Sequence, residues 1–161
     1  MWTNDYTDVA VNMPWTQTTA PMANTLNTGA LQDPTNVGTD QAFVYLRSGF
    51  YANKLAYLDS EVGEWTGVQF YYHMFGADCK DLHILAQYSH DSAPVQLEFT
   101  KTGQQQNAAA RKWLKRSVVF SQTAVKVRIA GSVGSLLEPY GEIAVGRITI
   151  SGIIPSCSDG A

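Results

Sequence analysis

The chain of 161 residues has a mass of 17.6 kDa, the usual size of one domain. Only 16% of its residues are charged and 45% are hydrophobic, which excludes a charge-rich disordered chain and a coiled coil. The net charge of −3 argues against nucleic-acid binding, and no stretch is as apolar and as long as a membrane span. We therefore expect neither a nucleic-acid partner nor a membrane partner.

The first region, residues 1–40, is rich in threonine, asparagine and glycine and contains three prolines but no lysine or arginine. Such residues favour extended segments with local hydrogen bonds over helices. The region also carries Trp2, Tyr6 and Trp15, whose large rings are unfavourable in water. We expect an extended arm that packs on the body of the protein or on a partner.

The second region, residues 41–157, shows the two-residue apolar period that is typical of half-buried β-strands. Clusters of glycine, proline and serine separate the apolar runs. The runs lie at 42–46, 55–58, 68–74, 82–84, 95–99, 117–120 and 125–129. This pattern predicts one all-β domain, an antiparallel sandwich or barrel, followed by a short tail at 158–161.

Two segments depart from simple alternation. Residues 107–116 have high helix propensity but no second apolar face, so we interpret them as a loop that runs into a strand. In residues 142–151 the apolar positions switch from odd to even numbers at Gly146-Arg147. A β-bulge produces such a switch, and we expect one there.

Five short segments occur in an order and spacing that can be compared with known families. They are Phe70–Gly76, Leu82–Ile84, Trp113 after a Gly/Gln-rich loop, Val125–Gly131 and Gly141–Val145. Together they resemble the MAM domain of meprins, neuropilins and receptor tyrosine phosphatases, over about residues 8–157. The resemblance implies a jelly-roll sandwich that serves adhesion and assembly without catalysis.

The cysteines depart from the pattern of that family. The family's cysteine before the aromatic strand corresponds to about Gly67 here, and its N-terminal pair is missing. Cys79 and Cys157 follow the aromatic strand and the last strand, so they lie at opposite ends if these strands run antiparallel. A strand of that length spans far more than a disulfide, at about 3.3 Å per residue. We expect two free thiols.

The family often binds calcium through acidic residues, and the resemblance gives Asp8 and Asp33 as counterparts. The last acidic pair of the family is replaced here by Gly146 and Arg147. Calcium prefers six to eight oxygen ligands, so a cation in that place argues against the site. We expect no cofactor, and we expect the Arg147 guanidinium to pair with Asp33 instead.

No serine or cysteine lies in a recognisable nucleophile motif, and the sequence predicts no enzyme. His73 alternates with apolar residues, and we interpret it as structural. One basic cluster can meet an acidic partner, with a solvated loop as the alternative: Arg111, Lys112, Lys115 and Arg116. Trp65 and Trp113 can stack on a sugar ring, with packing at the sandwich edge as the alternative.

Three functions stay open on the sequence. The first is a virion protein, such as a bacteriophage capsid decoration or cement protein, assembled in the host cytoplasm. Its partners would be subunits of a homo-oligomer or of the capsid shell, contacted through Trp2, Tyr6, Trp15 and the sandwich face. The second is an extracellular adhesion module, and the third is a carbohydrate-binding module that recognises glycans. The polar start after Met1 and the unpaired cysteines favour the first.

Overall fold

The computed structural model describes residues 1–22, 28–48, 53–94, 96–107, 111–134 and 141–155. Ten strands and no helix lie in these ranges, and none of the described residues forms a helix that could cross a membrane. Sheet A contains, in spatial order, β1 (Trp2–Asn4), β4 (Lys54–Ser60), β9 (Lys126–Val133), β6 (Cys79–Gln87) and β7 (Gln96–Thr102). Sheet B contains β2 (Thr16–Thr18), β3 (Phe43–Arg47), β10 (Glu142–Ile153), β5 (Glu64–Phe75) and β8 (Leu114–Ala124).

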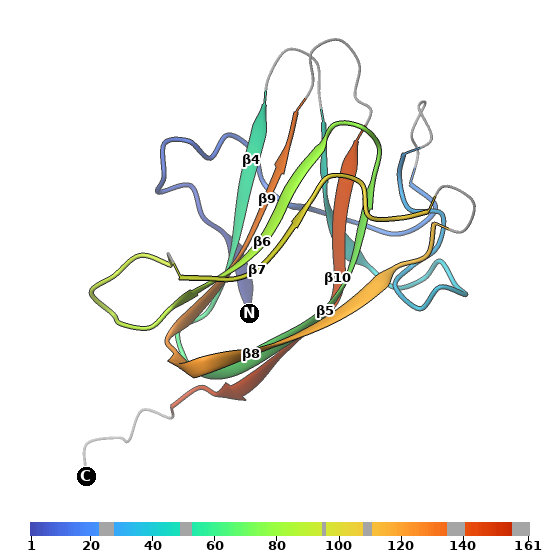
Figure 1. Ribbon diagram of the computed structural model, residues 1–161. Coiled ribbons are helices and arrows are strands. Elements are labelled where there is room, and N and C mark those ends of the chain that lie inside the picture. Colours follow the sequence, from blue (N-terminus) through green and yellow to red (C-terminus); the bar gives the residue numbers. More distant parts are fainter. Residues whose placement is uncertain (23–27, 49–52, 95, 108–110, 135–140, 156–161) are drawn as a thin grey trace.

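The two sheets pack face to face, and every pair of neighbouring strands is antiparallel (Figure 1). The predicted all-β jelly-roll sandwich is confirmed. Alternate residues of each strand point inward, as the two-residue period requires. On β5 these are Phe70, Tyr72 and Met74, which are buried in the core between the sheets. Phe70 meets Phe99 of sheet A edge to face, with ring centroids 5.4 Å apart.

The predicted bulge in β10 is present. The pairing register with β5 shifts between Gly146 and Thr149, and Arg147 has a φ of 48°. Because of this extra residue, Ile148 and Ile150 pack against the core while Arg147 is exposed to solvent. In the other atypical segment, residues 111–113 are irregular and lead into β8 at Leu114, in agreement with the prediction, while residues 108–110 lie outside the described residues.

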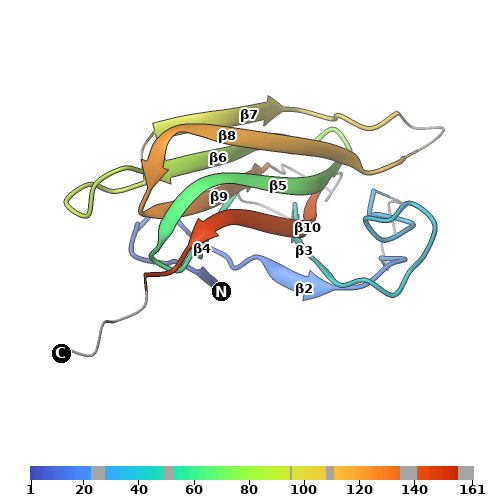
Figure 2. The same ribbon diagram turned by 90° about the horizontal axis from the view of Figure 1, so that it is seen from below.

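The N-terminal region packs on the body of the protein and contributes a strand to each sheet. β1 pairs with β4 at the edge of sheet A, and β2 pairs with β3 at the edge of sheet B. In Figure 2 this region (blue) runs beside β3 as it enters β2. Its two strands are thus hydrogen-bonded to strands of the body.

Trp15 lies just before β2, with only 3% of its surface exposed. Its indole occupies space left by Gly131 of β9, where a Cβ atom would lie 2.6 Å from the ring. Asn4 holds its backbone, accepting from the Trp15 N–H at 2.8 Å and donating to its carbonyl at 3.2 Å. The structure corrects the expectation that Trp15 contacts a partner, because the core encloses it. Trp2 is half-buried against the same core, whereas Tyr6 is 56% exposed.

β5 and β10 are antiparallel, as the expectation of two free thiols assumed, and one of the two cysteines lies among the described residues. Cys79 is buried and free, and its Sγ lies 3.3 Å from the carbonyl oxygen of Glu142, where β10 begins. Burial raises the pKa of this thiol to about 12, so it stays protonated at neutral pH. Cys157 lies outside the described residues.

The segments before β3 and β8 cover one half of the outer face of sheet B. A second apolar cluster lies beneath them: Ala20, Ala30, Phe43, Trp113 and Ala144. His73 of β5 faces this cluster, 1% exposed, with its ring 5.6 Å from that of Trp113. Burial, and after it the nearby Arg111 guanidinium, lowers the pKa of His73 to about 4. The structural interpretation of His73 agrees with this environment.

Trp15→Ala is expected to lower the free energy of unfolding by about 3–5 kcal/mol, because it leaves a cavity where the sheets meet. Deletion of residues 1–20 removes β1 and β2 as well and should unfold the domain. Urea denaturation measures both, with Tyr6→Ala as a surface control that changes stability by less than about 0.5 kcal/mol. A Trp15→Ala loss no larger than that of the control would show that the indole does not hold the sheets together.

A second prediction concerns pH. The folded-state pKa of His73 lies below its unfolded value of 6.5, so the unfolded chain gains a proton that the folded chain excludes as the pH falls. This linkage should remove about 3 kcal/mol of stability between pH 7 and pH 4. The carboxylate Asp5, whose pKa is lowered to about 2, loses its contribution only below its ordinary value of 3.8.

His73→Gln should flatten the dependence of unfolding free energy on pH between 7 and 4, whereas the same change at the exposed His90 should leave the slope intact. NMR titration of the His73 ring measures its pKa directly. A midpoint near 6.5 would contradict the burial argument.

Candidate functional site

The two tryptophans predicted to stack on sugars are both buried. Trp65 is 5% exposed, packs in the core and donates its indole N–H to the Glu61 carbonyl at 3.0 Å. Trp113 is 4% exposed and donates to the Gln32 carbonyl at 2.7 Å. Neither ring offers a face to a ligand, so the stacking prediction is wrong, and the alternative of packing is confirmed.

The basic cluster does not form one surface, because its first member is buried. The Arg111 guanidinium donates to the Gly29 carbonyl and lies over the Phe75 ring, 4.4 Å from its centroid. Burial lowers the pKa of Arg111, and the charge of Glu142 opposes that effect. Arg111 therefore holds the covering segment on sheet B and is not available to an acidic partner.

The other members of the cluster diverge. Lys115 and Arg116 are neighbours on β8, so their side chains point to opposite sides of the sheet. The Arg116 guanidinium lies 5.5 Å from the ring centroid of Phe99 in sheet A, whereas the Lys115 ammonium lies over Tyr71 on the outer face of sheet B. Lys112 is exposed in the loop before the strand.

The candidate calcium ligands lie in irregular segments that pack against different sheets. Asp8 is close to Tyr57 of sheet A, whose hydroxyl lies 3.5 Å from the carboxylate. Asp33 lies in the segment over sheet B and accepts from the backbone N–H groups of Thr35 and Gln41, at 2.9 and 3.1 Å. Burial alone would raise the pKa of Asp33, but these hydrogen bonds outweigh it and lower the pKa.

Asp8 and Asp33 thus do not converge on one ion, and the described residues contain no group of three His, Cys, Asp or Glu side chains suited to a metal. The predicted pair between Arg147 and Asp33 is replaced by a different contact. Arg147 lies over the Tyr71 ring, with its guanidinium carbon 5.2 Å from the ring centroid.

The uncovered half of the outer face of sheet B brings together side chains from three strands. We call it the Tyr71 face and define it by Gln69 and Tyr71 of β5, Lys115 and Ser117 of β8, and Arg147 of β10. Tyr71 is paired with Lys115 on one side and Gly146 on the other. Its ring therefore lies between two cations, the Arg147 guanidinium at 5.2 Å and the Lys115 ammonium at 5.9 Å.

Polar side chains continue the face beside the cations. Gln69 is paired with Ser117 on β8 and Thr149 on β10, and the Ser117 hydroxyl donates to the Gln69 amide oxygen at 3.2 Å. A groove of about 220 Å³ borders Gln69 and Ser117, and Gly67 is among the residues that line it. Its lining residues are Thr66, Gly67, Val68, Gln69, Ser117, Val118, Val119 and Ser151.

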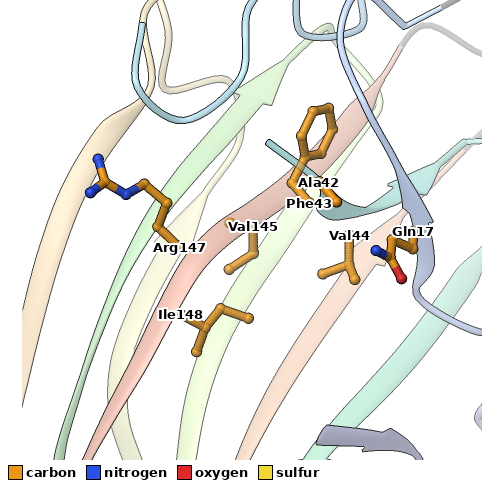
Figure 3. A pocket seen from close by; sticks show the side chains of 8 residues that line it. Gln17, Ala42, Phe43, Val44, Val145, Arg147 and Ile148 are labelled. Atoms are coloured by element: carbon orange, nitrogen blue, oxygen red, sulfur yellow. The ribbon is translucent and has the colours of Figure 1, made fainter. Parts of the chain in front are cut away.

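A second hollow, of about 170 Å³, borders the face where β3 begins (Figure 3). Phe43, the first residue of β3, pairs with Gly146, and none of the described residues pairs with this edge of β10 beyond Gly146. The hollow is lined by Gln17, Ala42, Phe43, Val44, Val145, Gly146, Arg147 and Ile148. Figure 3 shows Arg147 extending over β5, away from Val44 and Gln17.

The charge of the Tyr71 face differs from that of the chain as a whole. Within residues 67–71, 115–119 and 147–151 of its three strands, the outward positions hold no acid: Gly67, Gln69, Tyr71, Lys115, Ser117, Val119, Arg147, Thr149 and Ser151. On the outer face of sheet A, by contrast, Asp5 and Asp59 surround Arg128 at 2.6 and 2.7 Å. The cations of the Tyr71 face therefore stand out against a chain of net charge −3.

Sequence analysis found Lys115 but missed Tyr71 and Arg147. The alternation of Tyr71 with buried Phe70 and Tyr72 signals that its ring points outward. The parity switch at Arg147 signals the bulge that exposes it. Neither signal shows that the two side chains meet, because that depends on the register of distant strands.

Comparisons with known proteins agree with this architecture. The second adhesin domain (K2) of Lys-gingipain has 16% sequence identity to this chain and a TM-score of 0.57, covering 93% of this chain and 89% of its own. The first such domain (K1), from Porphyromonas gingivalis, has 13% identity and a TM-score of 0.55, covering 95% and 90%. At these identities the likeness shows a shared β-sandwich fold.

A carbohydrate-binding module specific for non-crystalline cellulose has 13% identity and a TM-score of 0.45, covering 73% of this chain and 78% of its own.

The family model described as MAM domain, meprin/A5/mu, matches residues 2–157. That match takes in both sheets and the N-terminal strands, so it describes the whole sandwich. The chain belongs to the MAM domain family.

Proposed function

We propose that this chain is a non-catalytic adhesion module that acts outside the cell and binds its partner through the Tyr71 face. The observation that carries the proposal is the contrast between the two halves of the outer face of sheet B. One half is covered by segments that bury Trp113 and Arg111, while the other half presents Tyr71, Lys115 and Arg147. A fold that covers part of a sheet and leaves a cationic part open has a surface for recognition.

Family membership supports this function among the three that the sequence left open. MAM domains are an adhesion-type family of extracellular proteins, and the similar gingipain domains are themselves adhesin domains. These comparisons give no support to the virion hypothesis, which the sequence alone favoured. The bead experiment below distinguishes a second copy of the chain from other partners.

The chemistry of the buried groups supports a role without catalysis. His73 has a pKa of about 4 and no access to solvent, so it cannot exchange protons with a substrate near neutral pH. The Cys79 thiol has a pKa of about 12 and is therefore a poor nucleophile. Both groups are enclosed in the sandwich rather than directed into a cleft.

The proposal predicts that bulk on the Tyr71 face prevents adhesion. Beads coated with the protein are applied to cultured cells and to surfaces coated with extracellular matrix, and bound beads are counted. Ser117→Trp places an indole beside the groove and should reduce binding at least tenfold. Thr100→Trp, an exposed position on β7 of sheet A, is the matched control and should bind like the parent.

Equal losses for both variants would place adhesion elsewhere on the molecule. Parent beads that adhere to none of these surfaces would contradict the adhesion function itself. Parent beads that clump with one another, with clumping lost in Ser117→Trp, would identify a second copy of the chain as the partner. Urea midpoints of both variants establish that they fold like the parent.

A further inference from the structure

We infer that the Tyr71 face binds an acidic polysaccharide, a polymer of uronate or sulfated sugar units. This inference rests on the proposed function and names the class of ligand at the same face. It is carried by the two cations, by the hydroxyl and amide groups beside them, and by the groove that continues the face.

The two cations are placed to hold anionic groups. Lys115 and Arg147 take part in no ion pair with an acid among the described residues, and both rest on the ring of Tyr71. The ring restrains two long side chains, so less conformational entropy is lost on binding. An ammonium and a planar guanidinium on one side of a sheet give charge-assisted hydrogen bonds to carboxylate or sulfate oxygens.

The bulge in β10 gives Arg147 this position. Its φ of 48° lies in the left-handed region, which is unusual for a residue other than glycine or asparagine. The bulge turns the side chain out of the core alternation and over β5. The two other register shifts described in sheet B lie beside Gly67 and Gly152, whereas this one gives a positive φ to an exposed cation. Backbone strain at such a residue points to a role for its side chain.

The neighbouring side chains favour a saccharide over an acidic peptide. Gln69, Ser117 and Thr149 form a row across three strands, and Thr66 and Ser151 line the groove beyond it. Hydroxyls and amides at fixed spacing match the alternating donors and acceptors of sugar hydroxyl groups. The described outward positions offer few apolar side chains, whereas the centre of a protein interface is usually apolar. Val119 is the exception and lies at the rim of the groove.

The test measures binding of the purified protein to four polymers by calorimetry at 50 and 200 mM salt. The polymers are heparin, polygalacturonate, neutral dextran and poly-glutamate. Heparin or polygalacturonate should bind, dextran should not, and affinity should fall at the higher salt. Poly-glutamate tests a peptide of similar charge, and it should bind at least tenfold more weakly.

Three substitutions locate the site. Lys115→Gln and Arg147→Asn should each weaken binding of the acidic polysaccharide about tenfold, since each removes a charged hydrogen-bond donor. Asparagine tolerates positive φ, so Arg147→Asn preserves the bulge. Arg116→Gln is the matched control, because it removes an adjacent charge on the opposite side of β8, and it should change affinity less than twofold.

The inference is overturned if Arg116→Gln weakens binding as much as Lys115→Gln, because the protein would then bind polyanions without a site. It is also overturned if poly-glutamate binds as tightly as the polysaccharides, which would make the ligand an acidic peptide. If no polysaccharide binds while Ser117→Trp still abolishes bead adhesion, the ligand class is wrong and the proposed function stands. Beads that do not adhere even without substitution overturn the function.

Discussion

The fold depends on the way Trp15 closes the edge of the sandwich. Its indole lies against Gly131 of sheet A, beside which the Leu46 side chain of sheet B also lies, and both side chains belong to the core between the sheets. Burial of a ring of this size contributes a few kcal/mol, a large part of the stability of a domain. Asn4 fixes the backbone on either side of the turn from sheet A to sheet B. The chain can therefore contribute β1 to one sheet and β2 to the other.

The path set by Trp15 also decides which part of sheet B meets solvent. After β2 the chain passes over the outer face of sheet B before it returns as β3. It covers the sheet around Ala144 of β10 and His73 of β5. Pro34 packs against Gly146, where the covering segment ends and the bulge begins. Beyond this point no described segment covers the outer face. The Tyr71 face begins where this covering segment ends. The bulge in β10 directs the Arg147 side chain onto the Tyr71 face.

Local patterns were enough to predict the strands and the bulge, because alternation reports which side of a strand is buried. They failed for Trp15 and Trp113, which lie in irregular segments, and for Trp65, which lies at the start of β5. At such positions a tryptophan is exposed or buried according to contacts far away in the sequence. Local patterns also failed to predict the Tyr71 face. Residues 71, 115 and 147 meet only when three distant strands adopt one register. The prediction of one basic cluster at 111–116 was wrong for a related reason. Lys115 and Arg116 are neighbours on β8, so their side chains point to opposite sides of the sheet.

A small face is sufficient for adhesion when many copies act together. The Tyr71 face offers two cations and a few polar groups, and contacts of this exposure are weakened by salt. A single such site binds weakly, but a polymer with repeated anionic units engages several copies on one surface, and each added copy raises the total affinity. Specificity then resides in the spacing of the cations and hydroxyls, which the sheet holds rigid. If the proposed ligand is correct, repeated binding of this kind would let an open sheet face recognise an extended polymer.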